Sequence, residues 1–142
     1  MILEDLYIAI SSFSNKAELY FCVEEFVKNH TAESDYYDYP LLEETLEFET
    51  EDFMEMLHFI VSNKKAYHFY FSNLENKENP KRMIFINSDQ SIYFGLAVYE
   101  IFSLKYQEIL KAQFPNSPLM ICNHVLPPNS FEAFKQQLKT VR

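Results

Sequence analysis

The sequence predicts an α+β fold in which a mostly antiparallel central sheet of about five strands carries packed helices. Three runs of aromatic and apolar residues with strand character follow one another between residues 66 and 99. Segments with helical periodicity and capping residues lie before and after these runs. The chain has 142 residues, of which 48% are hydrophobic, and this is enough for one domain, residues 1–142, with its own core.

The first strand and the first helix are predicted from residues 5–29. The stretch DLYIAISSF alternates between apolar and polar or small residues, which is typical of a half-buried strand. Ser14 or Asn15 can cap the helix that follows, and Glu18 has the capping-box spacing from Asn15. We therefore expect a helix near residues 15–29, with an apolar face made of Leu19, Cys22, Val23, Phe26 and Val27.

A second helix is predicted over residues 51–65, after a polar stretch. Residues 31–40 have the composition of a loop, and residues 41–49 could add a short edge strand. Thr50 is expected to cap the helix, whose first turn is acidic and whose last turn carries two lysines, as the helix dipole favours. Its core-facing residues have the spacing i, i+3, i+4, i+7 and are Phe53, Met56, Leu57 and Ile60.

Three successive strands are expected at residues 66–72, 82–88 and 91–99. The first alternates and is rich in aromatic residues, whereas the other two are nearly continuous in apolar character. Continuous apolar strands are typical of central positions covered on both faces, and the dipeptide DQ between them suits a hairpin. Gly95 lies in the middle of a strand, which predicts a bulge or the close approach of another backbone.

The last part of the chain is predicted to add two helices and a strand. Residues 103–114 have an amphipathic helical pattern that the sequence PNSP stops. Residues 119–125 predict another buried strand. A final helix is expected to begin near Asn129 or Ser130, with three residues turned inward: Phe131, Phe134 and Leu138.

Charge is distributed unevenly along the chain. The formal net charge is −9, but residues 1–63 hold 15 acidic and 2 basic residues (net −13), and residues 64–142 hold 6 acidic and 10 basic ones (net +4). An acidic half repels nucleic acid and anionic membranes, so neither is an expected partner. No segment has membrane-spanning length, and Glu4 and Asp5 stand where a signal peptide carries positive charge, so a cytoplasmic location is expected.

Few residues are candidates for catalysis or metal binding. Cys122 and His124 would share one face of a strand, but a nucleophilic cysteine needs a nearby cation or helix N-terminus, and core packing is expected. Glu55 and His58 lie three residues apart, outside any short metal-binding motif. With a single glycine in the chain, a phosphate-binding loop is disfavoured. We predict no catalytic residue, no metal and no cofactor, and we expect both cysteines, Cys22 and Cys122, to be reduced.

Two alternative functions remain open at this stage. The predicted order of elements resembles the acyl-CoA-dependent N-acyltransferase fold, a resemblance that implies an enzyme with a glycine-rich loop holding the cofactor's pyrophosphate. The matching place in this chain, residues 99–107, has no glycine and one basic residue. The other alternative is an adaptor module that forms a homodimer through an exposed strand.

The most unusual stretch is SDYYDYPLLEETLEFETEDF, residues 34–53. It contains eight carboxylates and three tyrosines but no lysine or arginine. Tyrosine gives a binding surface large contact area at low entropic cost, and carboxylates steer a cationic partner into register. Alternatively, the tyrosines pack locally on the helix of residues 51–64. We predict a partner-binding surface made of Tyr36, Tyr37, Asp38, Tyr39, Glu43, Glu44, Glu47, Glu51 and Glu55.

The C-terminal half carries a resemblance to a class of bacterial proteins. The stretches NSDQSIYFGLAVYE and PLMICNHVLPPNSFEAFK, with an amphipathic helix between them, resemble immunity proteins of bacterial toxin–immunity pairs, such as those of contact-dependent growth inhibition. The resemblance implies a non-enzymatic inhibitor of a cognate toxin. Many such toxins are nucleases with basic channels, so an acidic surface could act as a plug that mimics the nucleic-acid substrate.

Overall fold

The computed structural model describes residues 2–73 and 80–140. Its strands are β1 (Leu3–Ile10), β2 (Thr31–Ala32), β3 (Tyr37–Tyr39), β4 (Phe48–Thr50), β5 (Tyr67–Ser72), β6 (Lys81–Ile86), β7 (Ile92–Tyr99) and β8 (Leu119–Cys122). Its helices are α1 (Lys16–Phe26), α2 (Phe53–Ser62), α3 (Ser103–Gln113) and α4 (Phe131–Thr140), with a 3-10 turn η1 (Glu100–Phe102) before α3.

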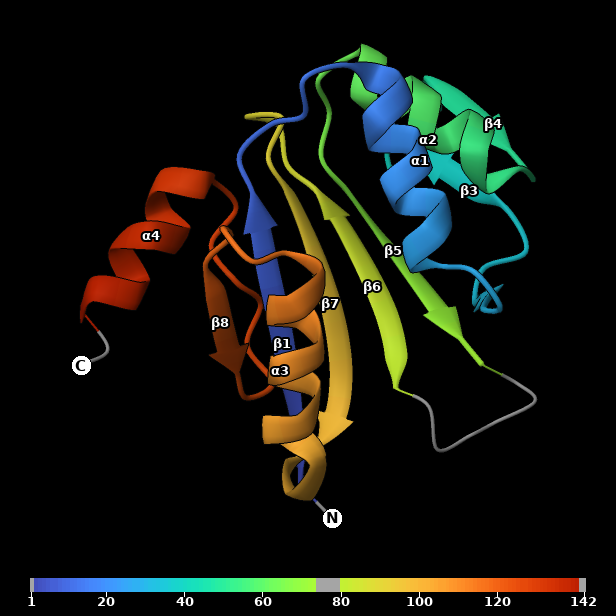
Figure 1. Ribbon diagram of the computed structural model, residues 1–142. Helices are drawn as coiled ribbons and strands as arrows, with labels where there is room; N and C mark the ends of the chain where they lie inside the picture. The colour runs from blue at the N-terminus through green and yellow to red at the C-terminus, as the bar shows by residue number, and fades with distance from the viewer. Residues whose placement is uncertain (1, 74–79, 141–142) are drawn as a thin grey trace.

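One antiparallel sheet forms the centre of the molecule, as Figure 1 shows, and its strand order is β2-β5-β6-β7-β1-β8. The predicted α+β class is confirmed, with six strands in this sheet and a separate two-stranded sheet of β3 and β4. The central placement of β6 and β7 is also confirmed. The polar segment between β5 and β6 includes residues 74–79, which lie outside the described residues.

The first face of the sheet carries the larger core. Side chains alternate along each strand, so Leu6 and Ile8 of β1 lie on the same face as their register partners in β7, Leu96 and Phe94. Helices α1, α2 and α3 pack on this face (Figure 1). The residues that they bury against it are Leu19, Val23, Phe26, Met56, Leu57, Ile60 and Leu110. The other members of the predicted stripes, Cys22, Val27 and Phe53, are only partly buried against this core.

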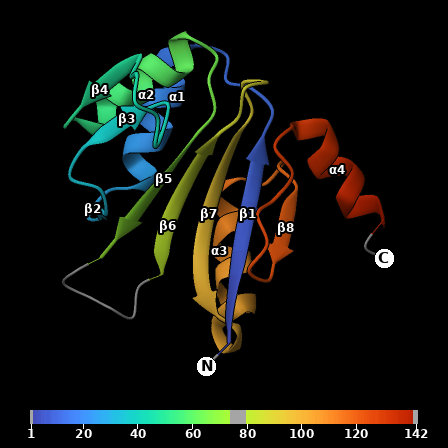
Figure 2. The same ribbon diagram turned by 180° about the vertical axis from the view of Figure 1, so that it is seen from behind.

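The second face is aromatic, and residues of α4 pack on part of it. Figure 2 shows α4 on the side of β8, away from α1 and α2. Tyr7, Phe85 and Tyr93 are buried there, and Phe134 of α4 packs against Tyr93 with ring centroids 4.9 Å apart. The Tyr93 hydroxyl donates to the carbonyl oxygens of Pro128 and Ser130, just before α4 begins. The three inward residues predicted for this helix therefore do face the sheet.

The two predicted helix caps had different outcomes. Asn15 caps α1, since its side chain accepts from the backbone N–H of Glu18 at 2.8 Å. Thr50 does not cap α2. Asp52 takes that place and accepts from the N–H of Met54, while the Thr50 hydroxyl accepts from the N–H of Asp52. Aspartate at this position is also favoured by the positive end of the helix dipole.

Three further sequence predictions need correction. Residues 31–40 are not one loop, because β2 pairs with β5 and β3 pairs with β4. The strand β8 ends at Cys122 and lies at the sheet edge, so its Ile121 is exposed rather than buried. Helix α1 ends at Phe26, three residues before the expected end. Among the described residues, no helix combines the length and the apolar character that crossing a membrane requires.

Gly95 makes room for an aromatic ring, not for a bulge or another backbone. The β1–β7 register is unbroken from Leu3–Tyr99 to Ile10–Ile92, so the predicted bulge is wrong. A Cβ atom at Gly95 would lie 2.9 Å from two ring carbons of Tyr7 and 3.1 Å from Cε of Met83. We expect Gly95→Ala to lower the free energy of unfolding by about 1–3 kcal/mol because the packed ring has little space to yield. Urea unfolding measures this loss.

A smaller residue at position 7 provides the control for Gly95→Ala. In a Tyr7→Leu background the ring carbons are absent, so adding the alanine methyl group should cost much less than it does in the wild type. An equal cost in both backgrounds would mean that the Tyr7 ring is not the obstacle.

Asp89 links the β6–β7 hairpin to the start of α4. Its Oδ1 accepts from the Ser91 N–H at 2.9 Å and from the Ser91 hydroxyl at 2.5 Å, and its Oδ2 accepts from the Phe131 N–H at 2.8 Å. Partial burial pushes the pKa of Asp89 up, but these hydrogen bonds outweigh burial and hold the pKa below its ordinary value of 3.8. We expect Asp89→Ala to cost about 1–2 kcal/mol of stability.

The stabilisation by Asp89 should depend on pH in a definite direction. Because the pKa is lower in the folded state, the contribution is fully present above the unfolded-state value of 3.8 and is lost as the pH falls through the folded-state value. The difference in urea midpoint between the wild type and Asp89→Asn should therefore shrink below about pH 4. A difference that stays constant down to about pH 2 would contradict the role of this carboxylate.

Candidate protein-binding surface

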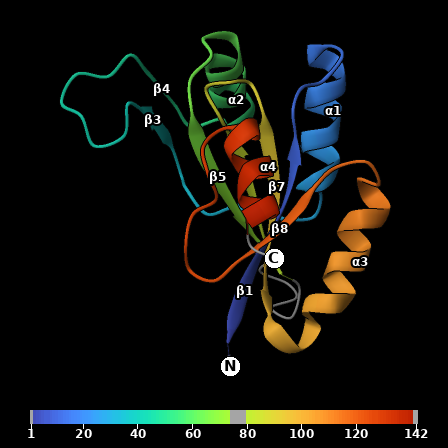
Figure 3. The same ribbon diagram turned by 90° about the vertical axis from the view of Figure 1, so that its left-hand side faces the viewer.

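The acidic stretch folds into a small hairpin beside α2. Strands β3 and β4 pair antiparallel, with Tyr37 opposite Thr50, Asp38 opposite Glu49 and Tyr39 opposite Phe48. The Glu47 N–H also donates to the carbonyl oxygen of Tyr39, at 2.8 Å, which closes the loop of residues 40–47. Figure 3 shows this hairpin and its loop projecting from the body on the side away from α3.

The inner face of the hairpin is aromatic and rests on the core. Tyr37 is 5% exposed, and its ring lies 5.6 Å from Phe69 and 6.4 Å from both Phe53 and Tyr67, between centroids. Burial raises the pKa of Tyr37 to about 12, with Tyr67 and Asp52 adding to the effect. Tyr37 is therefore an anchor, and its predicted place in the partner-binding surface is wrong.

A second set of aromatic contacts holds the far end of the hairpin. Tyr39 is half-buried, with its ring 5.8 Å from Phe59 of α2 and the ammonium of Lys65 above it at 5.7 Å. Phe48 stacks on Phe59 at 4.6 Å. The alternative prediction, in which the tyrosines pack locally, is therefore correct for Tyr37 and for the buried part of the Tyr39 ring. Both residues occupy inward positions of β3.

The outer side of the hairpin is exposed and acidic. We call its exposed side chains the acidic surface, and its members are Asp35, Tyr36, Leu41, Leu42, Glu43, Glu44, Glu47, Glu49, Glu51 and Glu55. Six of the nine predicted residues belong to it: Tyr36, Glu43, Glu44, Glu47, Glu51 and Glu55. Within residues 2–73 and 80–140, none of its carboxylates forms an ion pair with lysine or arginine.

Two leucines of the acidic surface were missed by the sequence analysis. Leu41 and Leu42 are both exposed, and Leu42 is fully exposed with a left-handed φ of 60°. The signal was present in the sequence, because a leucine pair directly after Pro40 fits neither a helical nor a strand period of the elements around it. Exposed aliphatic groups surrounded by charge are typical of protein-binding sites.

Asp38 occupies an intermediate position between anchor and surface. Its carbonyl oxygen accepts from the Tyr67 hydroxyl at 3.2 Å, which ties β3 to the main sheet. One of its carboxylate oxygens is buried and has no hydrogen-bond partner among the described residues. Asp38 also faces Glu49 across the hairpin, an arrangement of like charges that destabilises a strand pair.

The candidate nucleophile has an environment that opposes catalysis. Cys122 is buried, and burial together with the charge of Asp5 raises the pKa of its thiol to about 11, whereas a reactive cysteine needs a lowered pKa. His124 lies beyond the end of β8, exposed and with a φ of 62°, so the expectation that it shares a strand face with Cys122 does not apply. Cys22 and Cys122 are both free, on opposite faces of the sheet.

The remaining candidate sites are explained by local packing. His58 stacks on Tyr20, with ring centroids 4.0 Å apart, and no group of three or more potential metal-ligating side chains occurs among the described residues. At the place that would match a pyrophosphate loop, Phe102 precedes α3 without a capping side chain. Ile101 and Leu104, on either side, are exposed apolar residues rather than cations.

Comparisons of this chain with protein-family models, with curated proteins and with solved structures gave no significant match.

Proposed function

We propose that this chain is an immunity protein, a non-enzymatic inhibitor that binds a basic bacterial toxin, a nuclease in the first instance, through the acidic surface. The observation that carries the proposal is the composition of this surface, which combines the exposed Leu41 and Leu42 with carboxylates that form no ion pair with the described lysines and arginines. Exposed aliphatic side chains lower the solubility of an isolated protein, and the like charges of Asp38 and Glu49 face each other across the hairpin, so a partner that covers this surface gives both features a purpose.

The hairpin has the two parts that such a binding site needs. Its buried tyrosine and phenylalanine anchors fix the position of the loop, so that less conformational entropy is lost when a partner binds. Its carboxylates attract a cationic surface over a distance and speed the encounter, and its leucines and Tyr36 supply apolar contact area. In a nuclease, the carboxylates would take the place of phosphate groups in the basic channel, and the inhibitor would act in the cytoplasm, where that substrate is.

The test is co-purification with the protein encoded immediately upstream of this chain. A tag on that neighbour alone should retain this chain in a stoichiometric complex at low salt. We expect the double charge reversal Glu44→Lys with Glu47→Lys to slow association by about tenfold or more, because exposed charges act mainly on the association rate. The matched control is Glu100→Lys with Glu108→Lys, which changes the net charge equally on the exposed side of η1 and α3 and should have a smaller effect.

A third variant separates apolar contact from charge. Leu42→Asn replaces leucine by a residue that adopts the left-handed conformation more readily. The stability of the protein should therefore be unchanged or higher, while dissociation of the complex becomes faster. A complex that is indifferent to salt and to all of these substitutions would place the interface elsewhere. The absence of any complex with the neighbour, at low or high salt, would count against the function itself.

A further inference from the structure

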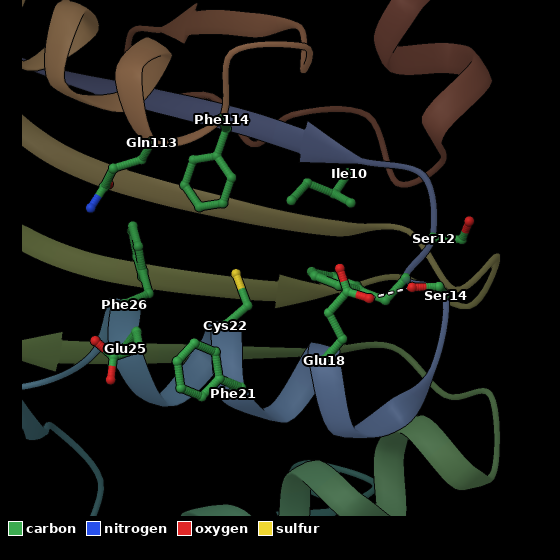
Figure 4. Close-up of a pocket in the computed structure, with 11 residues that line it drawn as sticks. Ile10, Ser12, Ser14, Glu18, Phe21, Cys22, Glu25, Phe26, Gln113 and Phe114 are labelled. Atoms are coloured by element: carbon green, nitrogen blue, oxygen red, sulfur yellow. Dashed lines mark hydrogen bonds between the residues drawn. The ribbon is translucent and has the colours of Figure 1, made fainter.

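A groove runs along α1 on the side opposite the acidic hairpin, between α1 and the end of α3. Its volume is about 710 Å³. Figure 4 shows α1 forming one wall with Glu18, Phe21, Cys22 and Glu25, and Gln113 and Phe114 forming the other. Ile10 and Phe26 lie between the two walls.

The wall formed by α1 is a second stripe of the helix. Residues 18, 21, 22 and 25 have the spacing i, i+3, i+4, i+7, and they lie beside the core stripe that contains Leu19, Val23 and Phe26. Phe21 is 66% exposed, although it stands in the middle of this second stripe. The helix therefore shows an apolar stripe to the core and, to the groove, a stripe in which Phe21 and Cys22 lie between two glutamates.

The charged side chains that line the groove are all negative. Among the described residues that line it, the charged ones are Glu18 and Glu25, and none is lysine or arginine. These carboxylates are seven residues apart on one helix, a separation of about 10 Å along the axis. The Ser14 hydroxyl donates to the Glu18 carboxylate and fixes its position at one end of the groove.

The surface of the groove between the two carboxylates is mainly apolar. Four phenylalanine rings line the groove, those of Phe13, Phe21, Phe26 and Phe114. Burial, with the charge of Glu18, raises the pKa of the Cys22 thiol to about 11, so this side chain is neutral at physiological pH and adds apolar surface. An occupant must therefore bring an apolar group to the middle and positive charge to both ends.

We propose that this groove binds a cationic amphipathic helical segment of a protein partner. A large apolar side chain of that segment lies between Phe21 and Phe114, and lysine or arginine residues on either side of it pair with Glu18 and Glu25. On a helix, cations about seven residues apart match the spacing of the two carboxylates. This binding site uses none of the residues of the acidic surface, so it stands whether or not that surface binds a toxin.

A synthetic peptide can test the proposal directly. The probe is a fluorescein-labelled amphipathic peptide of roughly 18 residues made of lysine and leucine, long enough to span the groove as a helix. One control peptide has the same composition in scrambled order, and another has glutamate in place of lysine. Fluorescence anisotropy at low salt should show the lysine–leucine peptide binding at least about tenfold more tightly than either control.

Variants of the protein locate the binding site. Phe21→Ser changes an exposed side chain, so the fold should be retained, and we expect it to weaken binding of the lysine–leucine peptide by about tenfold. Glu18→Gln with Glu25→Gln should weaken it by about fivefold at low salt and less at high salt. Glu100→Gln with Glu108→Gln removes the same charge from the exposed side of η1 and α3, outside both binding surfaces, and should leave the affinity within about twofold.

Several results would overturn this proposal without bearing on the toxin complex. They are no binding at about 1 mM peptide, equal binding of the lysine and glutamate peptides, and an affinity that Phe21→Ser does not change. A loss with Glu100→Gln and Glu108→Gln as large as with the groove variant would likewise overturn it, since general charge attraction would then explain the binding. Conversely, failure to co-purify with the neighbouring protein leaves the peptide result intact.

Discussion

Replacing Tyr37 by alanine is expected to lower the free energy of unfolding by about 3–5 kcal/mol, the loss typical of a buried aromatic residue. Tyr37 fills the junction between the hairpin, α2 and β5, where its ring contacts Phe53, Tyr67 and Phe69. Alanine would leave a cavity beneath β3 and would release the platform that holds the acidic surface. Urea unfolding should show a lower midpoint, and the proposed complex with a toxin should weaken as well, although Tyr37 is buried beneath the surface rather than part of it.

The adjacent tyrosine provides a matched control. Tyr36 is 63% exposed, so Tyr36→Ala should change stability by no more than about 0.5 kcal/mol while still weakening the complex. The pair thus separates a residue that supports the surface from one that belongs to it. If Tyr37→Ala unfolded at the wild-type midpoint, the hairpin would not be anchored through this ring.

Replacing Phe134 by alanine should have a similarly large effect on the opposite side of the molecule. Phe134 is fully buried and packs on Tyr93, and it is the one completely buried residue among the described side chains of α4. Its loss should cost about 3–5 kcal/mol and lower the melting temperature by about 10 °C. The second face of the sheet, with Tyr7, Phe85 and Tyr93, would then lose part of its cover.

An exposed residue of the same helix serves as the control for Phe134→Ala. Gln136 lies two residues further along α4 and is exposed, so Gln136→Ala should change the unfolding midpoint little. Phe134→Leu should recover most of the stability because it refills most of the volume. Equal effects of Phe134→Ala and Gln136→Ala on the unfolding midpoint would show that the packing of α4 on the sheet does not stabilise the folded state.

The position of the acidic surface follows from how the hairpin is anchored. A strand of three residues such as β3 places alternate side chains on opposite sides, so Tyr37 and Tyr39 turn inward and Asp38 turns outward. The inward rings meet α2 and β5, which come later in the chain. Without those contacts a two-stranded hairpin of this length would have little stability of its own.

The sequence predicted which carboxylates would be exposed but not which tyrosines would be buried. Glu43, Glu44, Glu47, Glu51 and Glu55 are exposed, because leaving a charge in water costs nothing and burying one unpaired is costly. A tyrosine is stable in either environment, so composition cannot assign Tyr36, Tyr37 and Tyr39 to a side. The leucines at positions 41 and 42 were overlooked because apolar residues are normally expected inside.

The sequence by itself determined the four helices, the long strands and the class of this fold. Periodicity and end signals located α1, α2, α3 and α4 and the long strands, because those signals come from residues within about one or two turns of each other. It also determined the charge difference between the two halves. These properties depend on local chemistry, which is written in the order of the residues.

The tertiary structure alone decided what lies next to what. It placed β1 between β7 and β8, set Gly95 against the Tyr7 ring and turned the acidic stretch into an anchored hairpin. It also opened the groove between α1 and α3, whose walls are about 90 residues apart in the chain. Such contacts depend on which distant surfaces fit together when the core is packed, and no local pattern of residues encodes that fit.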